Sequence, residues 1–485
     1  MGEKDLLVGV DVGTTSVKAG LFDAKGRALA HFSRFYPTHR GEGVVEQDPR
    51  DWTSGVVAAM DALLRDGVGD RVVAVGLCGQ VNTDVFVDGR GNALAPAIMW
   101  QDNRAAAEAA EIAAGVSEAD YEAWFGAPLP VGASHVLARM TWMARHRPAV
   151  YDDTRLVLSP KDYCLRALAG VAVSDPMSNF FVVGKDLAYL EPLLARVAGA
   201  RERLPPLRAF TDIVGEMPLG SSGQRAPVVA GTMDAWSGLF GAGVHKPGQG
   251  VYMSGTSEIL AAASRSRHGA PGVVTFPRAV GLNVHAGPTQ SGGDSLRWWG
   301  ATMGVDAAGV LALASRADRA GRPVLFLPHL EGERAPLWDS GLRGAFVGID
   351  GAAGGPEFAL AVLEGVALSA RMLLRSIDAA AVDPPARLFH AGGGARSDLW
   401  AQIRADCLGR PLDRVSYPDV GCLGAAIMAG VGVGVFGELR EGIAAMTRVE
   451  RSFEPNLRFG PRYDAMYEGY LRAIDALRPM GRIDY

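Results

Sequence analysis

A strand, a Gly-Thr turn and a second strand follow one another twice in this 485-residue chain. The first copy, GVDVGTTSVKAGLF, begins at Gly9, and the second, GVYMSGTSEILAAAS, begins at Gly250. The glycine- and proline-rich segment GAGVHKPGQG lies just before the second copy and is typical of a junction. A chain of this length also exceeds what one hydrophobic core fills. We therefore predict a duplicated α/β domain, with residues 1–244 and 245–485 as its two copies.

Composition narrows the class of protein. The chain has 48% hydrophobic residues, 62 glycines and 28 prolines, as expected for a turn-rich, soluble α/β protein. Its 48 Lys and Arg against 53 Asp and Glu give a net charge of only -5, and no basic block stands out. We therefore expect no nucleic-acid partner. No stretch of the sequence reaches the roughly 20 apolar residues of a membrane span.

The cysteines and the N-terminus bear on the compartment. The cysteines at positions 78, 164, 407 and 422 lie far apart without a CxxC pair, which argues against zinc ribbons, redox dithiols and a disulfide framework. The first apolar run, Leu6 to Val10, is too short for a signal peptide. We expect a cytoplasmic protein without a membrane partner, and we leave a homodimer open.

Turn signals and apolar runs predict the order of the elements. In residues 6–36, β-rich runs alternate with turns, which predicts an antiparallel meander with Asp11 at the end of its first strand. Ser159, Pro160 and Gly170 have the spacing of the N-cap, first residue and stop of a helix. Further expected elements are a strand at 72–77, a hairpin turn at 88–91, helices at about 103–114, 134–146 and 357–380, a strand and helix around residue 234, a strand and a Ser397-capped helix around residue 392, and a buried helix at 421–432.

Three glycine turns each follow a predicted strand: Gly13 to Ser16, Gly255 to Ser257, and Gly392 to Ala395. Phosphate groups need several backbone N–H donors at close range, and glycine permits both the backbone conformation and the close approach. A single turn of this kind is ordinarily only a connection between strands. Three turns at strand ends, however, could meet at one nucleotide.

The sequence lacks the motifs of the common nucleotide-binding folds. The chain has no G-x-x-x-x-G-K-[ST] loop, no G-x-G-x-x-G after the first strand, and no H-R-D or D-F-G set. The run Gly392-Gly393-Gly394 lacks the Rossmann spacing and comes late in the chain. A P-loop, Rossmann or protein-kinase fold is therefore excluded.

Two aspartates suit the transfer of a phosphoryl group to an alcohol. Asp11 closes a buried strand beside a phosphate-type turn, where a carboxylate is costly unless it holds a cation or its water shell. Asp234, in GTMDAW, opens a helix after a strand and a glycine turn. An aspartate at this position is ordinarily an N-cap. Beside three phosphate-type turns it also suits the carboxylate that accepts a hydroxyl proton.

Taken together, these segments resemble the FGGY family of carbohydrate kinases, which have the actin-like and hexokinase-like ATPase fold, over nearly the whole chain. GVDVGTTSVK is similar to the first phosphate motif of that family, GTMDA to its catalytic-aspartate motif, SGTS to its second phosphate turn and AGGGARSDLW to its adenosine motif. FLPHLEGERAPLWDSGLRGAFVGI and QSGGDSLRWW look most like the xylulokinase branch. The resemblance implies two RNase H-like α/β domains with a cleft between them, and phosphorylation of a small sugar or polyol, D-xylulose first, with ATP and Mg²⁺.

The resemblance also implies roles for individual residues. Asp234 would be the general base on the acceptor hydroxyl, and Asp11 would help to place Mg²⁺ through water. The residues implied to contact the nucleotide are Gly13, Thr14, Thr15, Lys18, Gly255 and Thr256 at the phosphates, and Gly393, Gly394, Ala395 and Ser397 on the adenosine side.

The acceptor side departs from the pattern of the family. After GLCGQ, xylulokinases usually show Met-His-Gly and glycerol kinases Arg-Glu-Thr, whereas this chain has Val81-Asn82-Thr83. An asparagine amide can donate to and accept from hydroxyls, but it supplies neither an imidazole nor a carboxylate. Ribulose, a pentitol, erythritol or another tetritol, and glycerol therefore stay open beside D-xylulose. The residues expected on the acceptor side are Gln80, Val81, Asn82, Trp100, Asp102 and Asp234.

Two other classes of protein could also account for these motifs. An actin- or chaperone-like ATP-binding protein would share the fold but lack an acceptor site, and it would tolerate a change at Asp234. A catalytically inactive sugar sensor is disfavoured because both Asp11 and Asp234 are present.

Overall fold

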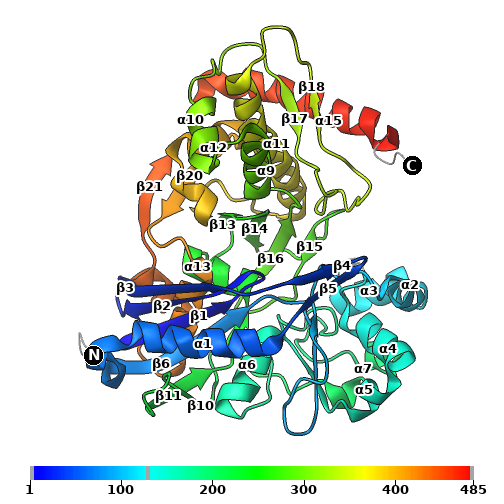
Figure 1. Cartoon of the computed structure of the whole chain (residues 1–485), viewed down its shortest axis with the longest axis vertical. Coiled ribbons are helices and arrows are strands. Elements are labelled where there is room, and N and C mark those ends of the chain that lie inside the picture. Colours follow the sequence, from blue (N-terminus) through cyan, green and yellow to red (C-terminus); the bar gives the residue numbers. More distant parts are fainter. Residues whose placement is uncertain (1–4, 127–130, 481–485) are drawn as a thin grey trace. The chain divides into compact units, whose positions relative to one another are not determined.

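The computed structural model describes residues 5–126 and 131–480, which divide into two compact units (Figure 1). The first unit comprises Met1–His245, Phe276–Ala279 and Asp419–Thr447, and the second comprises Lys246–Thr275, Val280–Pro418 and Arg448–Tyr485. The main stretch of the first unit thus ends one residue beyond the predicted boundary. The unit also takes in two later segments, which that boundary assigns to the other half of the chain.

The first unit is built on a seven-stranded sheet in the order β10-β11-β6-β1-β2-β3, with β12 also paired to β6. The predicted meander is confirmed, because β1, β2 and β3 pair antiparallel in sequence. The strands are β1 (Leu6–Val12), β2 (Ser16–Asp23), β3 (Ala28–Phe35), β6 (Val72–Gly79), β10 (Ile213–Pro218), β11 (Arg225–Val229) and β12 (Thr232–Met233).

The two faces of β1 have different partners. Val8 and Val10 share a core cluster with Trp52 of α1 (Pro49–Leu63). Gly9 faces α13 (Val420–Gly432) instead, and a Cβ on Gly9 would lie only 1.8 Å from the Cys422 carbonyl oxygen. Since side chains alternate along a strand, Asp11 belongs to the α13 face. Close packing on β1 explains why α13, late in the sequence, is part of the first unit.

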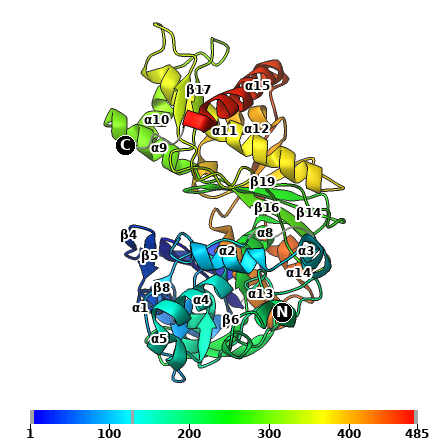
Figure 2. The same cartoon turned by 90° about the vertical axis from the view of Figure 1, so that its right-hand side faces the viewer.

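The remaining elements of the first unit are short sheets and helices beside the main sheet. The strands are β4 (His39–Gly41), β5 (Val44–Gln47) and β8 (Ala97–Ile98) in one sheet, and β7 (Val85–Val87) and β9 (Leu156–Leu158) in another. The helices are α2 (Ala106–Ala114), α3 (Glu118–Phe125), α4 (Val136–His146), α5 (Pro148–Asp153), α6 (Pro160–Ala169), α7 (Glu191–Leu194), α8 (Asp234–Ala242) and α14 (Leu439–Met446). Helices α2 to α5 lie together on the face of this unit that is turned toward the viewer in Figure 2, which is the right-hand side in Figure 1.

The second unit repeats the sheet of the first. Its seven strands run β15-β16-β14-β13-β19-β20-β21. In both sheets the hairpin strands β1/β2 and β13/β14 pair antiparallel, and β1 and β13 each pair parallel with a later strand. The strands are β13 (Gly250–Ser254), β14 (Glu258–Ser264), β15 (Val274–Thr275), β16 (Asn283–Pro288), β19 (Leu388–Ala391), β20 (Leu412–Val415) and β21 (Val449–Phe453), with β17 (Leu325–Leu327) and β18 (Ala345–Val347) apart. The predicted two-domain α/β architecture is confirmed.

One long helix organises the core of the second unit. Helix α11 (Gly355–Ala380) packs against α10 and α12 and is buried along most of its length. It begins two residues before the predicted start, because Pro356 can occupy its first turn. The other helices are α9 (Gly293–Met303), α10 (Ala307–Ala314), α12 (Asp398–Leu408) and α15 (Gly460–Leu477).

All four cysteines are buried and unbridged. Within residues 5–126 and 131–480, no helix combines the length and the apolarity needed to cross a membrane.

Candidate active site

The first glycine turn is anchored through its carbonyl groups. The Gly13 N–H donates to the Ser16 carbonyl over 3.1 Å and closes the turn. The Gly13 carbonyl accepts from the Gln80 amide (3.2 Å) and from the Tyr36 hydroxyl, and the Thr14 carbonyl accepts from the Gln47 amide (2.8 Å). Several side chains thus hold one conformation of the turn, which an anion site built from backbone groups requires.

Asp11 lies beside this turn, on the α13 face of β1. Its register partners are Lys18 on β2 and Cys78 on β6. Burial raises the pKa of Asp11, while Lys18 lowers it less. Its Oδ1 atom is buried and has no hydrogen-bond partner within the described part of the chain. An orphaned carboxylate oxygen beside a phosphate-type turn fits a hydrated cation, as expected for Mg²⁺.

Lys18 has a partner that the sequence analysis did not identify. Its Nζ lies 2.6 Å from Oδ1 of Asp419, the residue that precedes α13. Burial lowers the pKa of Lys18, but the charge and hydrogen bond of Asp419, together with the charge of Asp11, raise this pKa overall. Lys18 was expected at the phosphates; in this structure its charge is directed at Asp419.

Asp234 lies at the same edge of the sheet as Asp11. Strand β12 pairs parallel with β6, so that Thr232 is opposite Cys78, which is also the register partner of Asp11. Asp234 follows as the first residue of α8, and its carboxylate accepts from the Ala235 N–H over 2.7 Å. Met233, not Asp234, occupies the N-cap position. Burial, followed by the charge of Asp11, raises the pKa of Asp234 to about 7.

The segment that follows β6 carries most of the residues expected on the acceptor side. The Gln80 side chain is only 2% exposed and supports the first turn through Gly13. Asn82 has a φ of 55°, in the left-handed region that asparagine tolerates better than most residues. Val81 and Asn82 are half-buried. We conclude that Gln80 is an anchor of the turn, whereas Val81 and Asn82 remain available to a ligand.

Trp100 and Asp102 differ in their surroundings. The indole N–H of Trp100 donates to the Thr14 hydroxyl over 3.1 Å, which ties this half-buried ring to the first turn. Asp102 is 1% exposed; its carboxylate accepts from the Val45 N–H (2.7 Å) and pairs with Arg104 (2.7 Å). The carboxylate of Asp102 is therefore occupied inside the protein.

In the second unit, the turn after β13 is held by the start of α9. The Gly255 N–H donates to the Ser257 carbonyl over 3.0 Å, two residues ahead, whereas the Gly13 N–H reaches three residues ahead to Ser16. The N–H groups of Gly293 and Asp294 donate to the carbonyls of Gly255 (2.9 Å) and Thr256 (3.1 Å). Thr256 also accepts from Arg297 through its hydroxyl.

The third turn is tied to the second through one buried arginine. Arg404 of α12 donates to the Gly394 carbonyl (2.9 Å) and to the Ser254 hydroxyl (2.6 Å), and it pairs with Glu258 (3.0 Å). Its side chain is completely buried. Ser397 caps α12 as predicted, accepting from the Trp400 N–H over 3.3 Å. Arg404 thus fixes the two turns of this unit relative to each other.

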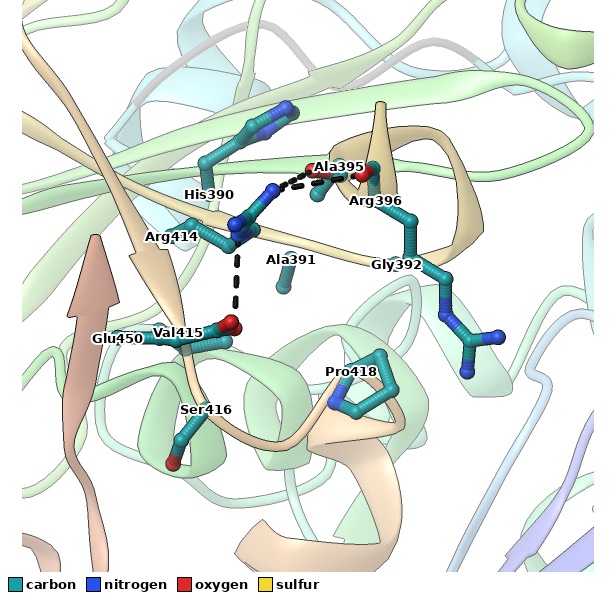
Figure 3. Close-up of a pocket in the computed structure, with 10 residues that line it drawn as sticks. All are labelled: His390, Ala391, Gly392, Ala395, Arg396, Arg414, Val415, Ser416, Pro418 and Glu450. Atoms are coloured by element: carbon teal, nitrogen blue, oxygen red, sulfur yellow. Dashed lines mark hydrogen bonds and ion pairs between the residues drawn. The ribbon is translucent and has the colours of Figure 1, made fainter. Parts of the chain in front are cut away.

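A cavity of about 310 Å³ opens beside the third turn (Figure 3). This volume is at the lower end of the range of small-ligand sites. Arg414 closes one side, where it donates to the carbonyls of Ala395 and Arg396 (both 3.4 Å) and pairs with Glu450 (3.4 Å). Of the residues expected on the adenosine side, Ala395 lines this cavity. Gly393, Gly394 and Ser397 belong to the same loop as Ala395. The lining residues are His390, Ala391, Gly392, Ala395, Arg396, Arg414, Val415, Ser416, Pro418 and Glu450.

Sequence reasoning missed several charged residues of these sites. Asp419 falls outside every motif, and its partner Lys18 is 401 positions away. Arg139, whose guanidinium donates to the Asn82 carbonyl, and Arg404 lie within helices, where an arginine ordinarily faces water. The available signal was their position among apolar neighbours at helical spacing. No group of three or more His, Cys, Asp or Glu side chains forms a metal site in the described ranges.

Known proteins match the chain along most of its length. Residues 6–241 match the N-terminal domain, and residues 250–433 the C-terminal domain, of the FGGY family of carbohydrate kinases. The chain is 30% identical to a xylulose kinase of Klebsiella pneumoniae, over 98% of this chain and 100% of the relative. It is also 30% identical to a glycerol kinase of Gloeobacter violaceus, over 97% of each chain. The crystal structure of a xylulose kinase from Rhodospirillum rubrum superposes with a TM-score of 0.85 at 25% identity, covering 98% of this chain and 99% of that chain.

Proposed function

This chain belongs to the FGGY family of carbohydrate kinases, and we propose that it transfers the terminal phosphoryl group of ATP to a hydroxyl of D-xylulose. The sequence resemblance to this family is thereby confirmed, as is a phosphotransferase acting on an alcohol. The choice of D-xylulose rests on relatives named as xylulose kinases and on the segments that look most like that branch.

One observation supports the mechanism most: two carboxylates, Asp11 and Asp234, at one sheet edge beside a glycine turn. The raised pKa of Asp234, about 7, suits a general base at neutral pH. In the proposed step, the acceptor hydroxyl gives its proton to the Asp234 carboxylate while its oxygen bonds to the terminal phosphorus. The bond between that phosphorus and the bridging oxygen breaks, and ADP leaves with the electron pair.

Asp11 is proposed to hold Mg²⁺ through water. Its orphaned Oδ1 atom supports this role, because a buried carboxylate oxygen without a donor is costly. When bound, Mg²⁺ would neutralise charge on the phosphates. Asp11 itself would orient water at Oδ1 while Gly13, Thr14, Thr15 and Lys18 line the phosphate side of the first unit. Lys18 would then share its charge between the phosphates and Asp419.

The second unit is proposed to bind the nucleotide. Gly255 would line the phosphates at the turn after β13, and Thr256 would donate to them through its hydroxyl. Gly393, Gly394, Ala395 and Ser397 would line the adenosine side, and the cavity of about 310 Å³ beside Ala395 supports that assignment. Arg404 would keep the two turns in register without contacting the nucleotide.

On the acceptor side, Val81, Asn82 and Trp100 are proposed to contact the sugar. Gln80 would hold the first turn through Gly13, and Asp102 would act through its contacts with Val45 and Arg104. The Asn82 amide can donate to one hydroxyl and accept from another. A relative named as a glycerol kinase is as similar as one named as a xylulose kinase. Glycerol, ribulose, pentitols and tetritols such as erythritol therefore stand as alternatives to D-xylulose.

An acceptor panel tests this proposal. ADP release is measured with ATP and Mg²⁺ for D-xylulose, ribulose, pentitols, erythritol, glycerol and sugar acids, and acceptors are ranked by kcat/KM. We expect D-xylulose to rank first and ADP to equal phosphorylated product. A different first acceptor would overturn the choice of sugar alone. A flat panel with ATP binding intact would favour the actin- or chaperone-like alternative.

A further inference from the structure

Arg139 is a completely buried arginine that contacts two separate stretches of backbone. It lies on α4, and its side chain is 0% exposed. Nη1 donates to the Asn82 carbonyl and, over 2.8 Å, to the Asp84 carboxylate, and Nη2 donates to the Met99 carbonyl. A buried guanidinium is costly unless it is paired and hydrogen-bonded, and these three contacts serve its two terminal nitrogens. Its buried Nε–H has no hydrogen-bond partner within the described residues.

The two carbonyls belong to the two segments expected on the acceptor side. Asn82 lies in the segment after β6, and Met99 directly precedes Trp100. The segments also meet directly, since Asp84 and Ile98 exchange two backbone hydrogen bonds of 3.0 Å. The backbone N–H of Trp100 donates to the Thr83 hydroxyl over 3.2 Å. Arg139 adds one hydrogen bond to each segment, at the Asn82 carbonyl and at the Met99 carbonyl.

Packing alone does not fix the Asn82 segment. A cavity of about 30 Å³ borders Asn82, Thr83 and Asp84, enough for one or two waters. Asn82 is held at a φ of 55°, a conformation that persists when surrounding contacts require it. The bond from Arg139 to its carbonyl fixes the orientation of that peptide plane. The direction in which the Asn82 amide leaves the backbone follows from it.

We propose that Arg139 is a positioning residue that sets the acceptor selectivity of this kinase. Arg139 fixes Asn82 relative to Trp100 without touching the acceptor. The carboxylate of Asp84 balances the positive charge of Arg139. This inference rests on the proposed function, because it takes Asn82 and Trp100 as residues that contact the acceptor. The other interpretation is a buried ion pair that only stabilises the fold.

The test compares Arg139→Met and Arg139→Lys with Arg145→Met. Arg145 lies on the same helix, is 48% exposed and pairs at the surface with Glu111, so it is a matched control. For each variant, kcat/KM is measured for the two best acceptors of the panel, with the KM for ATP and the ATP hydrolysis that occurs without acceptor. ATP affinity also reports whether the variant is folded.

We expect Arg139→Met to lower kcat/KM for the best acceptor by about 10²-fold, since small misplacements of positioning groups have effects of this size. The ratio between the two acceptors should move toward 1, while ATP affinity and acceptor-independent hydrolysis stay as in the wild type. Arg139→Lys keeps the charge but not the fork of donors, so it should recover part of the loss. Arg145→Met should change nothing.

An unchanged acceptor ratio in Arg139→Met, with ATP affinity intact, would overturn the inference. If Arg139→Met does not fold, Arg139→Lys and Asp84→Asn decide by the same ratio, and wild-type ratios in both would overturn it. A wild-type enzyme that phosphorylates no acceptor would sink the proposed function and this inference with it. If the wild type is active and the Arg139 variants keep its ratio of kcat/KM between the two acceptors, the inference is wrong and the proposed function stands.

Discussion

Gly421, in the first turn of α13, lies directly against the carboxylate of Asp11. A Cβ at this position would be 2.8 Å from Oδ2 of Asp11 and 3.2 Å from its Cγ. A buried carboxylate has little freedom to withdraw, because its strand pairs on both sides. Only glycine leaves the carboxylate where the structure has it.

Gly421→Ala should therefore displace Asp11. If Asp11 places Mg²⁺, we expect a higher Mg²⁺ requirement and kcat lower by about 10²-fold, as for other misplaced catalytic groups. The measurement is ADP release across a Mg²⁺ titration. Gly460→Ala is the control, since a Cβ there meets nothing within 4 Å. Wild-type Mg²⁺ dependence in Gly421→Ala would remove Asp11 from the proposed site.

The pH profile should show the raised pKa of Asp234. A base must be unprotonated to accept the hydroxyl proton, so kcat/KM for the acceptor should fall as the pH drops through about 7. Because the charge of Asp11 contributes to the raised pKa, the residual activity of Asp11→Asn should show this limb at lower pH. An acidic limb near the ordinary carboxylate value in the wild type would contradict the assignment.

Arg404 should matter to ATP and not to the acceptor. Loss of one partner from a buried ion pair leaves Glu258 uncompensated, at a cost of about 3–5 kcal/mol in stability. We expect Arg404→Met to lower the melting temperature and to raise the KM for ATP, since Ser254 and Gly394 lose their common donor. Arg472→Met, at an exposed position on α15, is the control. A raised acceptor KM with normal ATP binding would argue against this role.

Asn82→Gly separates the amide of Asn82 from its backbone conformation. Glycine adopts the observed φ of 55° readily, so the fold should retain its stability. We expect a higher acceptor KM at unchanged ATP affinity, because the donor and acceptor of the amide are lost. Asn82→Ala, strained at this φ, should lose stability as well. Equal acceptor KM in Asn82→Gly and the wild type would exclude an amide contact with the acceptor.

The sequence was sufficient to predict the local elements and the fold class. The meander of residues 6–36, the helix that Gly170 ends and the helix that Ser397 caps all follow from short-range turn and cap chemistry. The repeated strand and Gly-Thr turn predicted that the two units would have matching sheets. Local rules are enough for such features because their hydrogen bonds close within a few residues.

Long-range features were beyond these rules. Helix α13 was expected as buried, but nothing local could show that it packs on β1, more than 400 positions earlier. The same distance hides the pairing of Lys18 with Asp419. Asp102 looked available to a sugar because its neighbours match a family pattern, yet Val45 and Arg104 occupy its carboxylate. Side-chain partners from distant segments decide such roles.

The central claim, that Asp234 is the general base of a sugar kinase, is tested by Asp234→Asn. An unfolded aspartate titrates near 3.8, and the pKa in the folded protein is about 7, so folded-state stability declines as the pH rises from about 4 to 7 and stays reduced above. The asparagine side chain of the variant carries no such charge. The variant should thus melt higher than the wild type at pH 8, with the gap narrowing toward pH 5.

The deciding measurement is phosphoryl transfer from ATP to the best acceptor of the panel, with ATP binding measured on the same samples. We predict that Asp234→Asn lowers the transfer rate by roughly 10²-fold or more while it still binds ATP. Transfer at the wild-type rate in this variant would contradict the account.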